Sequence, residues 1–93
     1  MKFNEFLKKK RKQARMNKSL LAEKTGLSVS SITRLEAGEY LPTIETIEKL
    51  GDVLGEKEKF YFYAKKIPQN TETIMQVVDF ILKGDSGDKM EQD

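Results

Sequence analysis

The sequence predicts an all-α protein of six helices, and three observations lead to this fold class. Apolar residues recur three and four positions apart along most of the chain, which is the spacing of one helix face. Ser, Thr or Asn precedes most of these segments and Gly follows most of them, as at helix ends. The alternation typical of strands occurs only briefly, in "KFYFYA". We therefore expect a compact five-helix domain with an additional C-terminal helix.

The first helix is predicted from one apolar stripe near the N-terminus, made of Phe3, Phe6, Leu7 and Ala14. Arg11 falls on the same stripe, one turn beyond Leu7. In the third predicted helix, Glu36 lies one turn beyond Ile32 on the inward face. Because a charge is not stable in a core without a partner, we expect Arg11 and Glu36 to form an ion pair between these helices.

The second and third predicted helices are joined by the short stretch "TGLS". Asn17 caps the second helix, over residues 18–25, and Gly26 ends it, while Ser28 caps the third. Two short helices with so short a connection cross steeply, as in a helix-turn-helix. The outer side of the third helix then carries small and polar residues suited to reading base edges in a major groove about 12 Å wide. These residues are Val29, Ser30, Thr33 and Arg34.

Three more helices are expected in the remainder of the chain. Thr43 caps a fourth, which ends before Gly55, and a fifth spans residues 57–66. Asn70 or Thr71 caps a sixth over residues 72–83, closed by Gly84. We divide the chain into a helix-turn-helix DNA-binding domain (1–67), a C-terminal dimerisation helix (68–84) and a disordered tail (85–93), since the tail has almost nothing to bury.

Charge is divided unevenly along the chain, although the formal net charge is only +2. Residues 1–34 hold ten Lys or Arg against two Glu, and residues 35–93 hold seven Lys against thirteen Asp or Glu. The first third is therefore basic and the remainder acidic. Such asymmetry favours contact between one face and a polyanion.

Composition also excludes several classes of protein. The chain has no Cys and no His, so it lacks the residues for disulfides and the commonest metal ligand and general base. No apolar run approaches a membrane span or a signal peptide, and the apolar residues of the first helix are needed for a small core rather than for a membrane surface. We expect a cytoplasmic protein that is not an enzyme, uses no metal or other cofactor, and has no membrane partner.

The motif "LAEKTGLSVSSITRLEAG", followed by "P-T-x-x-T-x-x-K-L", resembles the helix-turn-helix core of the phage Cro and repressor type, also called the Xre family. The resemblance covers about residues 3 to 55. It implies a lambda-repressor-like helix-turn-helix domain that acts as a transcriptional regulator, usually as a homodimer. It assigns base contacts to the outer residues of the third helix named above. By the same resemblance, DNA phosphates are bound by Asn17, Lys18, Ser31 and the loop around Tyr40.

Two of these positions depart from the family pattern. Lys18 stands where the family often has glutamine, and lysine supplies a phosphate charge without the bracing of an amide. Val29 replaces a base reader that is commonly polar, and its apolar side chain suits a thymine methyl.

The sixth helix carries too many apolar residues to pack on one side alone. A homodimer covers them economically and pairs two half-sites of a palindromic operator in double-stranded DNA. The expected dimer interface comprises Phe60, Phe62, Ile74, Val77, Val78 and Ile81. We predict a sequence-specific regulator, most simply a repressor. The alternative is an antitoxin or other interaction module whose C-terminal helices bind a protein partner.

Overall fold

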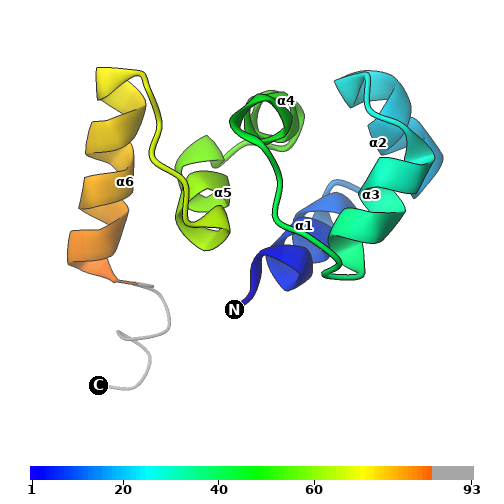
Figure 1. Ribbon diagram of the computed structural model, residues 1–93, viewed down its shortest axis with the longest axis horizontal. Coiled ribbons are helices and arrows are strands. Elements are labelled where there is room, and N and C mark those ends of the chain that lie inside the picture. The colour runs from blue at the N-terminus through cyan, green and yellow to red at the C-terminus, as the bar shows by residue number, and fades with distance from the viewer. Residues whose placement is uncertain (85–93) are drawn as a thin grey trace.

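The computed structural model describes residues 1–84 and forms a layered bundle of helices (Figure 1). The prediction of an all-α fold is confirmed, since this part of the chain contains six helices and no strand. The predicted tail, residues 85–93, lies outside the described residues. The helices are α1 (Phe3–Gln13), α2 (Lys18–Thr25), α3 (Val29–Glu36), α4 (Ile44–Leu54), α5 (Lys57–Ala64) and α6 (Thr71–Lys83).

Side-chain caps begin four of these helices. Asn17 accepts a hydrogen bond from the backbone N–H of Leu20 at 2.8 Å, and Ser28 accepts one from Ser31 at 3.0 Å. At α4 the cap is Thr43, and at α6 it is Asn70 rather than Thr71. Each cap satisfies a backbone donor that the first turn of a helix leaves free. These polar residues therefore fix where each helix starts.

One predicted helix end and one predicted core residue are wrong. Lys65 has a positive φ of 59°, so α5 ends at Ala64 and Lys66 lies outside it. Ala14 follows the last turn of α1 and is exposed rather than part of the apolar stripe. A left-handed residue cannot continue a right-handed helix, which explains the earlier end of α5.

One core joins the first five helices, and α6 adds no buried residue to it. The completely buried side chains include Leu7 of α1, Leu21 of α2, Ile32 of α3, and Ile47 and Leu50 of α4. Phe60 of α5 is also completely buried, so its expected place in a dimer interface is wrong. Its ring instead packs edge-on against Phe6, with 4.8 Å between ring centroids.

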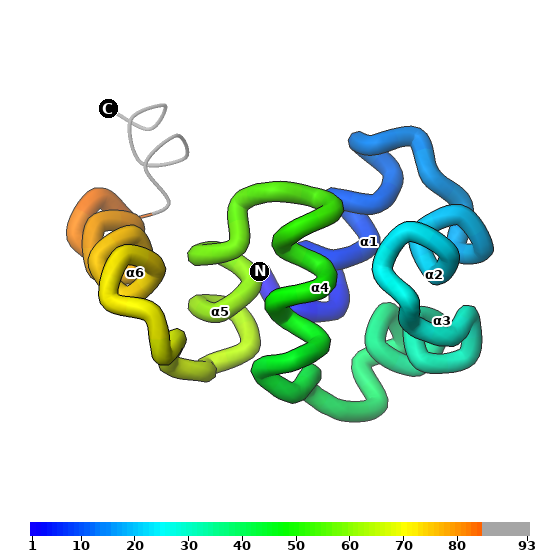
Figure 2. Tube along the Cα trace, turned by 90° about the horizontal axis from the view of Figure 1, so that it is seen from above, coloured from blue at the N-terminus to red at the C-terminus, as the bar shows by residue number. Residues whose placement is uncertain are grey.

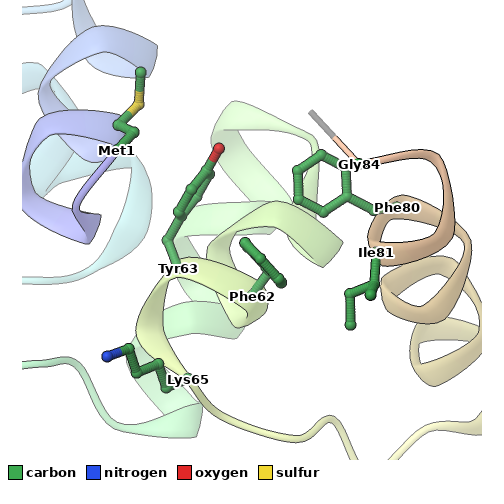
Figure 3. Close-up of a pocket in the computed structure, with 7 residues that line it drawn as sticks. All are labelled: Met1, Phe62, Tyr63, Lys65, Phe80, Ile81 and Gly84. Atoms are coloured by element: carbon green, nitrogen blue, oxygen red, sulfur yellow. The ribbon is translucent and has the colours of Figure 1, made fainter. Parts of the chain in front are cut away.

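The helices are arranged so that α2 and α3 lie at one end of the molecule and α6 at the other (Figures 1 and 2). Helix α5 separates α6 from α4 and makes the main contacts with α6. Aromatic rings form much of this junction. The ring centroid of Phe80 in α6 lies 5.0 Å from that of Phe62 and 6.3 Å from that of Tyr63, both in α5. Figure 3 shows these rings beside an open cavity of about 440 Å³. No described helix has the length and apolar character required to cross a membrane.

Candidate nucleic-acid interface

Helix α3 packs onto the core through Ile32 and Leu35, whose side chains are almost wholly buried. It packs against both α1 and α2. Gly26 makes the sharp turn between α2 and α3 because its φ of 79° is accessible to glycine at little cost. This packing fixes α3 and leaves its opposite side facing outward.

The four predicted base-reading residues share the outer side of α3. Val29 is 43% exposed, and Ser30, Thr33 and Arg34 are exposed as well. Together they present a short apolar side chain, two hydroxyls and one guanidinium. This is a surface narrow enough for a major groove and equipped with hydrogen-bonding groups for base edges.

The start of α2 presents two groups with free hydrogen-bonding capacity. The side-chain oxygen of Asn17 accepts the capping hydrogen bond from the backbone N–H of Leu20, which leaves the side-chain amide N–H groups of Asn17 able to donate. Lys18 follows at the first position of the helix, where the helix dipole favours an anion. Both predicted phosphate-binding residues therefore lie at one helix end suited to an anion.

The other two predicted phosphate-binding residues lie at either end of α3. The hydroxyl of Ser31 accepts a hydrogen bond from Ser28 Oγ at 2.9 Å, so its own proton remains available to donate. Tyr40 is 46% exposed and lies in the loop after α3. The structure thus brings Ser31 beside the base-reading residues and places Tyr40 beyond the opposite end of the helix.

A second cation, which sequence reasoning did not single out, lies near Lys18. Lys8 of α1 lines the same shallow cleft, about 430 Å³ in volume, as Lys18 of α2 and Thr33 of α3. Neither lysine has a carboxylate partner within residues 1–84. Three helices therefore contribute to one cationic surface next to the outer side of α3.

The basic run of α1 divides into paired and unpaired charges. Lys10 is bound to Glu56 at 2.8 Å, and this hydrogen bond, together with one from Lys59, lowers the pKa of the Glu56 carboxyl. Lys8, Lys9 and Lys12 are exposed. Periodicity alone does not distinguish these roles, because the carboxylate partner lies far away in the sequence.

Arg11 and Glu36 meet behind α3 through two parallel hydrogen bonds. Arg11 Nε donates to Glu36 Oε2 at 2.7 Å, and Nη2 donates to Oε1 at 3.0 Å. Arg11 Nη1 donates to the carbonyl oxygen of Met16 at 2.9 Å, just before α2. The bond to Glu36 raises the pKa of Arg11, against the effect of burial. One guanidinium thus ties α1 to α3 and to the segment that leads into α2.

A chain in which a short turn joins the packed helices α2 and α3, with α3 exposed and a cationic surface beside it, is a helix-turn-helix protein. Residues 7–61 match the helix-turn-helix family model, and the chain belongs to this family. It is also similar to the cryptic phage CTXphi transcriptional repressor RstR of Vibrio cholerae serotype O1. The two are 28% identical over 96 residues, covering 89% of this chain and 86% of the relative. No solved structure gives a significant match.

These comparisons identify the chain as a DNA-binding transcriptional regulator rather than an enzyme. The identification agrees with the arrangement of α2 and α3 described above. It also confirms the resemblance to the Xre type that the motif of α2 and α3 indicates.

Proposed function

We propose that the protein is a repressor that binds a specific operator in double-stranded DNA and thereby blocks a promoter. The observation that carries this proposal is the outward side of α3, where Val29, Ser30, Thr33 and Arg34 are exposed next to unpaired lysines. The name of the Vibrio cholerae relative, a transcriptional repressor, supports the same direction of regulation. Because the target is DNA, we expect the protein to act in the cytoplasm.

In this proposal the two groups of residues have different tasks. Arg34 donates two hydrogen bonds to one guanine, Ser30 and Thr33 bond neighbouring base edges, and Val29 contacts a thymine methyl. Asn17, Lys18, Ser31 and Tyr40 bind phosphates and set the position of α3 without reading sequence. We add Lys8 to the phosphate-binding group because it shares a cleft with Lys18.

We further propose that the protein binds as a homodimer to a palindromic operator. One eight-residue helix reads few bases, and a two-fold dimer doubles the number read. Since α3 and α6 lie at opposite ends of a molecule 38 Å long, contact through α6 leaves α3 free (Figure 1). Two copies placed end to end would hold their α3 helices further apart than one DNA turn, about 34 Å. Half-sites at that spacing therefore require the long axes of the two copies to be inclined to each other.

Selection of binding sites from random duplex DNA tests the proposal directly. We expect an enriched palindrome for the unaltered chain, and relaxed preference at one position of each half-site for Arg34→Ala, at a cost of about 1 to 3 kcal/mol. Lys66→Ala is the matched control because it removes a cation between α5 and α6. Enrichment of no sequence would refute specific recognition. A cognate operator that raises transcription of a linked promoter would refute the repressor role.

A second candidate function is that of an antitoxin or other module whose C-terminal helices bind a protein partner. The observation that favours it is the exposed apolar surface of α6, where Leu82 is 80% exposed. Purification separates the two candidates. A homogeneous, soluble dimer without another protein supports the repressor, and aggregation relieved only by a co-expressed neighbour supports the antitoxin.

A further inference from the structure

Helix α6 presents an apolar face that no other part of the described chain covers. Its exposed apolar residues are Met75, Val78, Ile81 and Leu82, exposed by 66%, 47%, 52% and 80%. Ile81 lies at the edge nearer α5, where it borders the cavity lined by Phe62 and Tyr63. Val78 lies at the centre of this face, with Met75 one turn before it and Leu82 one turn after it. Phe80 and Val77 instead face α5 and the core. The uncovered surface is therefore a stripe centred on one residue.

The two edges of this stripe differ in chemistry. Along one edge lie Glu72, Asp79 and Lys83, with the acidic residues nearer the start of the helix and the lysine at its end. Along the other edge lie Ile74 and Ile81. Asp79 and Lys83 already form an ion pair at 3.2 Å, while Glu72 has no charged partner within residues 1–84.

We propose that the occupant of this face is α6 of a second copy, packed antiparallel about a two-fold axis at Val78. This inference rests on the homodimer proposed above and names its contact surface and orientation. In this arrangement Val78 meets Val78 of the second copy, and Met75 lies opposite Leu82 of the second copy. The apolar stripe is then covered along its whole length, as an isologous interface requires.

Charge complementarity favours the antiparallel orientation over the parallel one. In an antiparallel pair, each edge meets the same edge of the second copy running in the opposite direction. Glu72 then lies near Lys83 of the second copy, and Ile74 lies near Ile81 of the second copy. The two Asp79 carboxylates lie on either side of the axis, and each is paired with Lys83 of its own chain. A parallel two-fold pair would instead place each charged edge against an isoleucine edge, where charges lose hydration without gaining a partner.

Single introduced cysteines test this register cleanly, because the natural chain contains none. We expect Val78→Cys to form a disulfide-linked dimer by itself on mild oxidation. Met75→Cys and Leu82→Cys should cross-link efficiently when mixed, and each should cross-link far less by itself. Gln76→Cys, exposed on the same helix but outside the stripe, is the control. Efficient self-cross-linking of Met75→Cys, or none at Val78→Cys, would overturn the arrangement.

Sedimentation measurements without DNA provide a second test. Val78→Glu should raise the dissociation constant of the dimer on the order of 100-fold, since two carboxylates meet at the axis, whereas Gln76→Glu should not change it. Glu72→Lys and Lys83→Glu should each weaken the dimer roughly three- to tenfold, and the double exchange should restore it. Circular dichroism checks that each variant folds. A dimer that Val78→Glu leaves intact would overturn the proposal.

These measurements are independent of DNA recognition. A dimer with the predicted cross-links that binds no DNA would contradict the proposed repressor and leave the interface standing. A monomer that binds DNA specifically would contradict the homodimer and its interface, and leave sequence-specific recognition by α3 standing.

Discussion

The backbone of Gly51 in α4 passes so close to Lys57 of α5 that a Cβ atom at Gly51 would lie 2.7 Å from the Cβ and Cγ atoms of Lys57. This approach also brings the Lys57 ammonium to within 2.8 Å of Glu48 and 2.6 Å of Asp52. Tyr61 donates a hydrogen bond from its hydroxyl to the same Glu48 carboxylate. The missing side chain of Gly51 thus allows one polar network to join α4 and α5.

We expect Gly51→Ala to destabilise the protein, although alanine ordinarily stabilises a helix interior relative to glycine by about 0.5 to 1 kcal/mol. The added methyl group overlaps with the stem of Lys57 and has to push α5 away, which costs roughly 1 to 3 kcal/mol. Urea denaturation measures the difference. Ser19→Ala, at an exposed position of α2, is the control for helix propensity. An unchanged or increased free energy of unfolding for Gly51→Ala would show that α4 and α5 pack less closely.

The same network predicts a loss of stability at alkaline pH. Burial, and secondarily the hydrogen bond to Glu48, raises the pKa of Tyr61 from 10.0 to about 12. The folded state therefore favours the protonated phenol, so its contribution is complete below pH 10 and is lost as the pH rises toward 12. Hydrogen bonds to Asp52 and Glu48 raise the pKa of Lys57. Loss of the Lys57 proton at alkaline pH therefore also destabilises the folded state.

Thermal unfolding at pH values from about 9 to 12 checks this prediction. The melting temperature of the natural chain should fall more steeply with rising pH than that of Tyr61→Phe, which keeps the ring but has no phenolic proton to lose. Parallel curves for the two proteins would mean that Tyr61 ionises as easily in the folded state as in the unfolded one.

Much of the fold could be predicted from sequence because its signals are local. Asn17, Ser28 and Thr43 cap their helices through backbone groups three residues away. The pairing of Arg11 with Glu36 could also be predicted, since each charge falls on an apolar stripe and needs a partner. Local pattern therefore indicated both the helices and one long-range contact between them.

The remaining features depend on contacts between distant segments. In the sequence, nothing distinguishes Lys8 and Lys18 from Lys10. Only the folded structure shows that Lys10 is paired with Glu56, whereas Lys8 and Lys18 line a cleft. Phe60 and Phe62 occupy one aromatic run, yet Phe60 is completely buried and Phe62 is 38% exposed, because they fall on different sides of α5. The uncovered face of α6 follows from its apolar content, but which residues form it depends on how the helix packs against α5.

The cleft that Lys8, Lys18 and Thr33 line yields a prediction about the salt dependence of DNA binding. Each lysine that neutralises a phosphate releases counterions, so Lys8→Ala and Lys18→Ala should each make the slope of log affinity against log salt shallower by about one unit. Both should weaken binding to cognate and random duplexes alike. Fluorescence anisotropy titrations over a range of salt concentrations measure the slopes, with Lys66→Ala as the control. A change in preferred sequence at constant slope would assign the lysine to base reading instead.

The ion pair behind α3 yields the last prediction. Arg11 and Glu36 have side chains only 10% and 4% exposed, and two hydrogen bonds join them. Glu36→Ala leaves the guanidinium without its charged partner in a largely buried place. Removing one member of such a pair costs about 3 to 5 kcal/mol, a large share of the stability of a small domain.

Joint replacement by Arg11→Met and Glu36→Leu should cost far less than either single loss, because it leaves no unpaired charge. Arg11→Met also removes the donor to the Met16 carbonyl, so some destabilisation remains in the double variant. Denaturation of Arg11→Met, of Glu36→Leu and of the double variant gives the coupling energy between the two side chains. Losses that add, each below about 1 kcal/mol, would mean that the two charges act independently. The Arg11–Glu36 pair would then not be what holds α3 against α1.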